Sequence, residues 1–246
     1  MATFVLIHGA WHGGWCWKKV TPLLRSAGHD VYMPTLTGLG ERSHLSTPDI
    51  DLDTHITDVV NLLECEGLHN VILVGHSYGG LVMEGVAIRD ADRLHQLVNL
   101  DGEFPIDDDR SMAGLLGRLR PAVWASLEAR MRESGDRWLI AAPNSGETLF
   151  GVTEPHDLEW MHQRFVAHPA KTFLQRVPDD NEKVSHLPRA YIYCPVPEEH
   201  TTYPFAQRAR SNGWGFHEIA GAGHDAMITK PEELSRLLVT LATATA

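Results

Sequence analysis

The sequence predicts an α/β fold in which a mostly parallel β-sheet is flanked by helices. Short apolar runs alternate with segments of helical periodicity over roughly the first 100 residues, and the same alternation returns near the C-terminus. Repeated strand–helix–strand units of this kind are typical of parallel sheets that are covered on both faces. Because the alternation stops in between, we expect a core of residues 1–104 and 187–246 with an inserted helical cap of residues 105–186.

Four strands and three helices are expected in the first part of the core. The strands are apolar runs bounded by glycine, proline or polar residues, whereas the helices repeat apolar residues every three or four positions. Gly28 and Gly67 follow two of the helices, where a left-handed residue commonly ends a helix. The expected strands are residues 4–8, 30–33, 71–74 and 94–100, and the expected helices are 16–27, 53–66 and 79–89, with a loop at 36–48.

The cap and the second part of the core follow. Helical segments are expected in the cap at residues 111–119, 122–133 and 158–167. Trp124 and Trp160 are the cap side chains that we expect to contact a substrate, and the alternative is that they form the core of the cap itself. After the cap, the expected strands are residues 190–194 and 215–219, and the expected helices are 204–211 and 231–241.

Charge and cysteine content exclude several classes of function. The formal net charge is −11, from 32 acidic and 21 basic residues, which disfavours nucleic acid and anionic membranes as partners. No apolar run approaches the ~20 residues that span a bilayer, and no signal peptide is expected at the N-terminus. Three widely spaced cysteines suggest neither a disulfide framework nor a metal site, so we expect a cytoplasmic protein.

The motif Gly75-His76-Ser77-Tyr78-Gly79 lies between an expected strand and an expected helix. A G-x-S-x-G motif in this position forms a sharp, strained turn that exposes a serine hydroxyl, and its glycines let the two backbones pass closely. We therefore expect Ser77 to be a nucleophile. Since a hydroxyl is a poor nucleophile at neutral pH, Ser77 requires a general base nearby.

His224 is the expected base, because it lies in a glycine-rich loop between the last expected strand and the last expected helix. The chain order serine, acid, histidine is one in which such triads occur. Asp101, at the end of the fourth expected strand, is the first choice for the acid. Glu198 and Glu199, in the loop after the fifth expected strand, are the alternatives.

Two backbone N–H groups are needed to stabilise the oxyanion that forms when a serine attacks a carbonyl. Tyr78 follows the nucleophile and supplies one of them, and Ala10, in the loop after the first strand, is expected to supply the other. Neither the loop at His12-Gly13-Gly14 nor any other segment has a phosphate-binding glycine pattern or a zinc-ligand spacing. We therefore expect no metal and no cofactor.

Four segments together resemble one subfamily of the α/β-hydrolases. It includes plant methyl-salicylate esterases, hydroxynitrile lyases and bacterial esterases, among them one that hydrolyses a methyl carbamate fungicide of the carbendazim type. The resemblance implies catalytic roles for Ser77 and His224 and oxyanion donors at Ala10 and Tyr78. The segments are His8-Gly9-Ala10-Trp11-His12-Gly13-Gly14-Trp15-Cys16-Trp17, Pro34-Thr35-Leu36-Thr37-Gly38-Leu39-Gly40, Gly75-His76-Ser77-Tyr78-Gly79-Gly80 and Gly223-His224-Asp225.

Two departures from the subfamily affect the interpretation. The plant members take their acid from the loop after the late strand, where this chain has no aspartate, so the identity of the acid stays open. The lyases carry a lysine directly after the histidine, whereas this chain has Asp225, which disfavours cyanohydrin cleavage.

The expected function is that of a serine hydrolase acting on a small carboxylic ester or methyl carbamate through an acyl-enzyme on Ser77. A lactonase or a hydroxynitrile-lyase-like enzyme on the same scaffold is an alternative, and a non-catalytic ligand-binding receptor is another. The partner is expected to be a small molecule, and a homodimer is possible.

Overall fold

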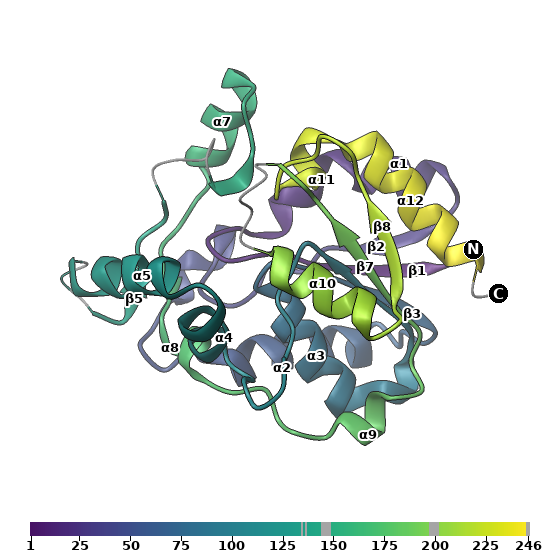
Figure 1. Ribbon diagram of the computed structural model, residues 1–246. Helices are drawn as coiled ribbons and strands as arrows, with labels where there is room; N and C mark the ends of the chain where they lie inside the picture. The colour runs from purple at the N-terminus through teal and green to yellow at the C-terminus, as the bar shows by residue number, and fades with distance from the viewer. Residues whose placement is uncertain (134, 136, 144–148, 197–201, 245–246) are drawn as a thin grey trace.

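The computed structural model describes residues 1–133, 135, 137–143, 149–196 and 202–244. Its centre is a six-stranded sheet with the order β2-β1-β3-β4-β7-β8, and every neighbouring pair of strands is parallel (Figure 1). The expected parallel sheet is therefore confirmed. The strands are β1 (Thr3–Ile7), β2 (Asp30–Tyr32), β3 (Val71–His76), β4 (Leu94–Leu100), β7 (Arg189–Tyr193) and β8 (Gly215–Glu218).

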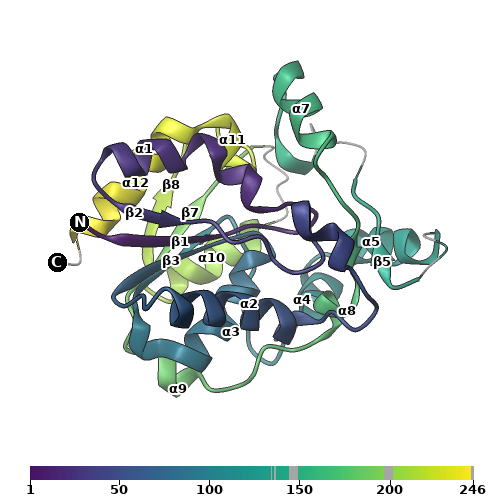
Figure 2. The same cartoon turned by 180° about the vertical axis from the view of Figure 1, so that it is seen from behind.

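The helices of the core lie in two layers, one on each face of the sheet. α1 (Thr21–Ser26) and α12 (Pro231–Ala244) lie on one side, and α2 (Leu52–Cys65), α3 (Gly79–Asp90) and α10 (Tyr203–Ser211) lie on the other (Figures 1 and 2). The separation of α1 from α2, α3 and α10 follows from the strand order, because parallel crossovers are right-handed and the direction of travel across the sheet reverses after β2. Both faces of the central strands are consequently buried.

Local sequence explains why these elements form. All six residues of β3 are buried, as expected for a central parallel strand that reads as a continuous apolar run. In α2, the Asp51 side chain accepts a hydrogen bond from the Thr54 N–H at 3.0 Å, and the two residues form a reciprocal capping box. The apolar stripe that begins after this cap packs on α3.

One expected helix is interrupted in the structure. Residues 16–27 were predicted as a single helix, but the chain forms a 3₁₀ helix, η1 (Gly14–Lys19), followed by α1. Pro22 explains the break, because proline lacks the N–H that a helix interior requires and is accepted in the first turn, where the structure places it. The expected loop at 36–48 also contains a 3₁₀ helix, η2 (Gly40–Leu45).

The segment between β4 and β7 extends beyond the carboxyl ends of the strands, where α4, α5 and α7 lie to the left in Figure 1. It is mainly helical, but it also contains a short antiparallel strand pair that the sequence did not predict. The predicted helix at 158–167 begins earlier and ends at His162, and the Val166 N–H bonds to Trp11 O at 3.3 Å. The elements are α4 (Met112–Leu119), α5 (Pro121–Glu133), β5 (Leu139–Ile140), α7 (Pro155–His162), β6 (His168–Pro169), α8 (Lys171–Leu174) and α9 (Asn181–Val184).

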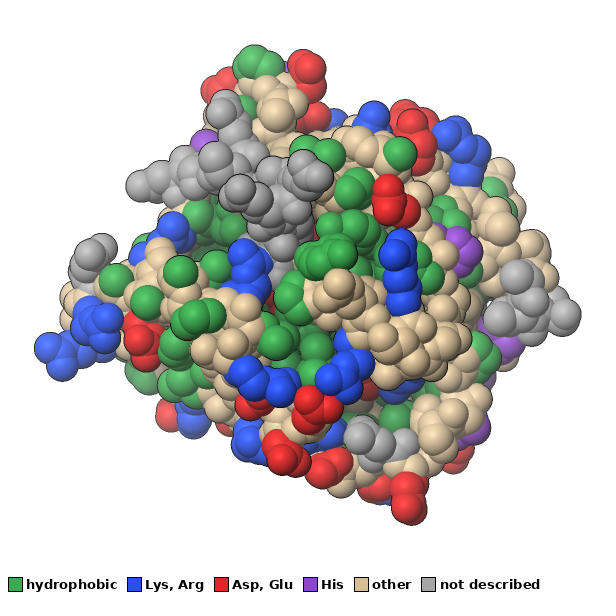
Figure 3. Space-filling model, in the orientation of Figure 1, with side chains coloured by type: hydrophobic (Ala, Val, Ile, Leu, Met, Phe, Trp, Pro, Cys, Tyr) green, Lys and Arg blue, Asp and Glu red, His purple; other side chains and the backbone are tan. Residues whose placement is uncertain are grey.

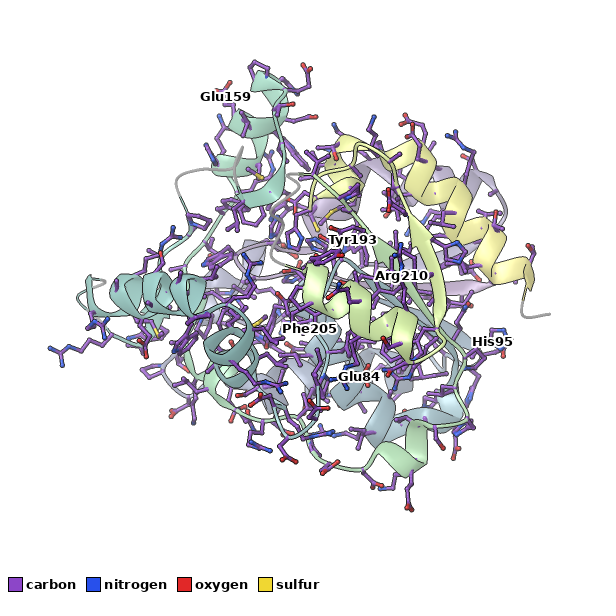
Figure 4. All side chains as sticks on the ribbon, viewed as in Figure 1. Glu84, His95, Glu159, Tyr193, Phe205 and Arg210 are labelled. Atoms are coloured by element: carbon purple, nitrogen blue, oxygen red, sulfur yellow. The ribbon has the colours of Figure 1, made fainter. Side chains whose placement is uncertain are left out.

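Side chains connect the layers. Glu84 of α3 and Phe205 of α10 are marked in Figure 4. Glu84 forms a partly buried ion pair with Arg189 at the start of β7, and Phe205 packs edge-on against Phe104 with ring centroids 5.6 Å apart. The remaining elements are η3 (Ala91–Arg93) and α11 (Ala226–Thr229).

Acidic and basic side chains are interspersed along the lower edge of the face drawn in Figure 3. Within the described ranges, no helix combines the length and hydropathy that a membrane crossing requires.

Candidate active site

Ser77 lies at the tip of the turn between β3 and α3, with a positive φ of 53°. Such a φ is rare for a residue other than glycine and places strain at this position. Neighbouring glycines make the turn possible, since a Cβ on Gly75 would lie 2.6 Å from Gly79 O and one on Gly79 would lie 2.8 Å from His8 O. The sharp strand–turn–helix geometry expected for Ser77 is present.

The structure brings Asp101 and His224 together. Asp101 Oδ2 lies 2.7 Å from His224 Nδ1, and both residues are buried. Asp101 Oδ1 accepts hydrogen bonds from Thr202 Oγ1 at 2.7 Å and from the Cys194 N–H at 3.2 Å, so the carboxylate is fixed on two sides. Glu198 and Glu199, the alternative acids, lie outside the described residues.

The surroundings of His224 favour its charged form. Burial by itself lowers the pKa of this imidazole, but the hydrogen bond and the charge of Asp101 raise it, with further contributions from Asp225 and Glu103. The net pKa of His224 is raised above its ordinary value. An aspartate that holds Nδ1–H leaves Nε2 as the basic nitrogen, which is the arrangement that a general base needs.

Ser77, His224 and Ala10 line one small cavity of about 60 Å³. Trp11, Phe150 and Phe173 contribute its aromatic surface, and Trp124 and Trp160 are not among the described residues that line it. Trp160 packs edge-on against Trp15 instead, with ring centroids 5.0 Å apart. The other lining residues are Glu103, Met112, Leu116, Val123, Leu127 and Leu149.

The expected oxyanion donors are available. In the described part of the chain, neither the Ala10 N–H nor the Tyr78 N–H has a hydrogen-bond acceptor. The loop that carries Ala10 is held by His12, whose Nδ1 donates to Ala10 O at 2.7 Å. Tyr78 is fixed by its buried side chain, which stacks on Phe173 and bonds to His55 Nδ1 at 2.9 Å.

A buried polar network supports the loop of His224, and the sequence did not reveal it. Asp225 Oδ2 lies 2.9 Å from His12 Nε2, and His76 Nε2 donates to His224 O at 3.0 Å. Since His12 Nδ1 also faces a carbonyl acceptor, a proton must lie between His12 Nε2 and Asp225. The network joins the Ala10 loop, the Ser77 turn and the His224 loop.

The same network contains the one group of potential metal ligands found among the described residues. Ligand atoms of His76, His224 and Asp225 lie within 4.8 Å of one another. His76 Nε2 and His224 Nδ1 are already used in hydrogen bonds, to His224 O and to Asp101 respectively. These bonds explain the positions of both imidazoles.

Glu103 is a second ionisable group in the cavity that sequence reasoning missed. Its position two residues after Asp101, immediately beyond a buried strand, was the available signal. Burial raises the pKa of this carboxyl to about 7, although the charges of His224 and Arg120 act in the opposite direction. The cavity therefore combines an apolar wall with a carboxyl group.

Comparisons with known proteins agree with this geometry. The sequence matches the profile of the "Alpha/beta hydrolase family" over residues 4–237. It is 38% identical to the "Carbendazim hydrolyzing esterase" of Nocardioides sp. (strain SG-4G), covering 98% of this chain and 100% of that protein. "Methylesterase 2" of Arabidopsis thaliana is 28% identical, with 97% of this chain and 95% of that protein covered.

A solved structure is similar over the whole chain. The extracellular α/β-hydrolase from a Paenibacillus species, described as sharing structural and functional homology with tobacco salicylic acid binding protein 2, superposes with a TM-score of 0.82. Its sequence is 25% identical, and the match covers 98% of each chain.

Proposed function

Because this chain belongs to the α/β-hydrolase family, we propose that it is a serine hydrolase that cleaves small carboxylic esters or methyl carbamates. The observation that supports this proposal most strongly is the placement of Ser77 and His224 on one cavity, with Nδ1 of His224 bonded to buried Asp101. Carboxylic ester hydrolysis is also the activity named for several relatives.

In the proposed mechanism, Ser77 Oγ attacks the substrate carbonyl while His224 Nε2 takes the hydroxyl proton. Asp101 orients the imidazole and stabilises its charged form. The negative charge that develops on the carbonyl oxygen is bound by the N–H groups of Ala10 and Tyr78. His224 then returns the proton to the leaving alcohol, and water releases the acyl group from Ser77 by the same steps in reverse.

The size of the cavity and the names of the relatives support the proposed substrates. A cavity of about 60 Å³ with mostly apolar walls fits a compact acyl group. The Nocardioides relative is named for carbendazim, which supports the inclusion of methyl carbamates. A lactonase would use the same groups, so lactones belong in the substrate panel.

The test compares the wild-type protein with Ser77→Ala on methyl esters, p-nitrophenyl esters, lactones and aryl methyl carbamates. We expect kcat/KM to fall by about 10³-fold or more in Ser77→Ala. Ser43→Ala, at an exposed serine, is the matched control and should keep full activity. An organophosphonate should label the wild-type protein at Ser77, whereas a receptor without catalysis would remain unlabelled and turn over no substrate.

The cytoplasmic location is also proposed. Cys16, Cys65 and Cys194 are all free in the structure, and Cys65 is exposed, which suits a reducing compartment. Association into a homodimer stays a prediction.

A further inference from the structure

Glu103 is packed directly against the turn that carries the nucleophile. Its backbone N–H donates to Ser77 O at 3.3 Å, and its own carbonyl oxygen lies so close to Gly80 that a Cβ there would be 2.3 Å away. The Glu103 side chain lines the same cavity as Ser77 and His224. A substrate whose carbonyl reaches Ser77 would therefore enter the cavity that Glu103 lines.

The carboxyl of Glu103 is left without a partner. Neither of its oxygens forms a hydrogen bond with another described side chain or backbone group, and Oε2 is completely buried. An unsatisfied buried polar group destabilises a folded protein, and such groups in native proteins require an explanation. A leucine at this position would complete the apolar wall at no such cost.

The charged groups described around Glu103 do not form an ion pair with its carboxyl either. Arg120, between α4 and α5, is near enough for its charge to lower the pKa of the Glu103 carboxyl, but the two residues form no ion pair in the described structure. His224 acts in the same direction, and Asp101 acts in the opposite one. His224 is bonded through Nδ1 to Asp101. The free carboxyl is thus held beside the reaction centre.

We propose that Glu103 is a specificity-determining residue whose carboxyl accepts a hydrogen bond from an N–H or O–H that the substrate carries next to its scissile carbonyl. The favoured substrates are those with such a donor, such as carbamates with a free N–H and 2-hydroxy esters, over simple esters of the same shape. This inference rests on the proposed function, because it assumes that Ser77 attacks the carbonyl in this cavity. With this role for Glu103, the substrate site combines apolar walls with a single polar contact to the substrate.

The experiment uses three methyl esters that differ in the group beside the carbonyl: methyl N-phenylcarbamate, methyl phenylacetate and methyl N-methyl-N-phenylcarbamate. These place N–H, CH₂ and N–CH₃ respectively beside the carbonyl, and all three lose methanol. The measurement is the kcat/KM of the N–H carbamate divided by that of each of the other two, for wild type, Glu103→Leu and Glu103→Gln. Because intrinsic reactivity is the same for every variant, a change in these ratios reports on the enzyme alone.

We expect Glu103→Leu to lower both ratios by roughly 10- to 100-fold, since it removes an acceptor for the substrate N–H. Glu103→Gln keeps an acceptor oxygen, so the ratios should fall by less. Glu64→Leu, at an exposed glutamate of α2, is the matched control and should keep the wild-type ratios.

Each outcome decides the proposal. Unchanged ratios in a folded Glu103→Leu variant would overturn the role of Glu103 while leaving the serine mechanism intact. If Glu103→Leu does not fold, a third variant, Glu103→Met, is compared with Glu103→Gln instead. Ratios that are the same in these two variants and in wild type would then overturn the role of Glu103. Turnover that survives Ser77→Ala, or the absence of turnover in wild type, would overturn the proposed function and this inference with it.

Discussion

Asp101 Oδ2 lies 2.7 Å from His224 Nδ1, although the two residues are 123 positions apart in the sequence. The contact joins the end of β4 to the loop that follows β8, across the intervening strand β7. Asp101 itself has a positive φ of 45°, so the backbone is strained where the carboxylate turns towards the imidazole. In the proposed mechanism, the acid therefore directly follows β4 rather than lying in the later loop.

Replacing this acid tests its assignment. We expect Asp101→Asn to lower kcat/KM by roughly 10²- to 10⁴-fold, because the amide cannot stabilise the imidazolium and favours the wrong tautomer. The measurement is steady-state hydrolysis of the best methyl ester, with circular dichroism to confirm the fold. Asp49→Asn, at an exposed aspartate, should have no effect. If Glu198→Gln caused the large loss and Asp101→Asn did not, the acid would lie in the later loop.

The pH dependence of the reaction follows from the raised pKa of His224. The base works only when neutral, so kcat/KM should fall as the pH drops through a value above the ordinary 6.5 of histidine. The charges of Asp101 and Glu103 help to raise that pKa, and removing either should move the acidic limb to lower pH. Profiles of wild type and Glu103→Gln between about pH 5 and about pH 9 check this expectation. A limb at the same pH in both proteins would contradict it.

The buried pair of His12 and Asp225 should contribute to stability. Removing one partner leaves the other without its hydrogen bond, so we expect Asp225→Ala to lower the free energy of unfolding by about 3–5 kcal/mol. Urea denaturation measures the loss. Asp225→Asn keeps an acceptor oxygen for His12 and should lose less. Equal losses in the two variants would show that packing, rather than the polar contact, makes the contribution.

Close packing at the nucleophile turn can be tested at Gly80. A Cβ there would lie 2.3 Å from Glu103 O and 2.9 Å from Asn99 Nδ2, so Gly80→Ala must displace backbone. We expect a loss of about 1–3 kcal/mol in the free energy of unfolding. Gly117→Ala is the matched control, because the nearest described atom outside its own helix backbone and chain neighbours would lie 3.9 Å from the added Cβ, and alanine favours the helix by up to about 1 kcal/mol. Equal urea midpoints for the two variants would contradict the steric explanation.

The elements that the sequence predicted well are those in which local pattern and tertiary burial agree. The strand at residues 94–100 and the helix after Ser77 are mostly apolar and almost entirely buried, and both occur close to their expected bounds. Pro22 was a local signal against a single helix, and the prediction of a helix at 16–27 did not take it into account. The antiparallel pair of β5 and β6 depends on contacts between residues far apart in the sequence, which no local pattern contains.

The residues of the candidate site also differ in how well the local sequence predicts their positions. Ser77, His224 and the Ala10 loop could be predicted because short motifs specify the turns that position them. Asp101 was the first choice for the acid, but Glu198 and Glu199 stayed open, because the choice depends on a distance across the sheet. Glu103 was missed for a similar reason: a carboxyl beyond a strand is usually solvated, and only the packing of α4 and α5 encloses it.

Glu103 should also make stability depend on pH. Its pKa is about 7 in the folded protein against 4.5 for an ordinary glutamate, so the folded state retains a proton that the unfolded chain releases. Below about pH 4.5 the carboxyl is protonated in both states, so its ionisation does not change the free energy of unfolding. As the pH rises to about 7 the unfolded state ionises first, and the free energy of unfolding falls before it levels off.

Glu103→Gln cannot ionise, so its melting temperature relative to wild type should rise over this interval. Thermal denaturation of both proteins across the interval, with Glu64→Gln as the exposed control, measures the difference. A constant difference would mean that the Glu103 carboxyl has the same pKa in the folded and unfolded states, and its carboxylate would then have to be stabilised in the folded protein by groups other than those described around it.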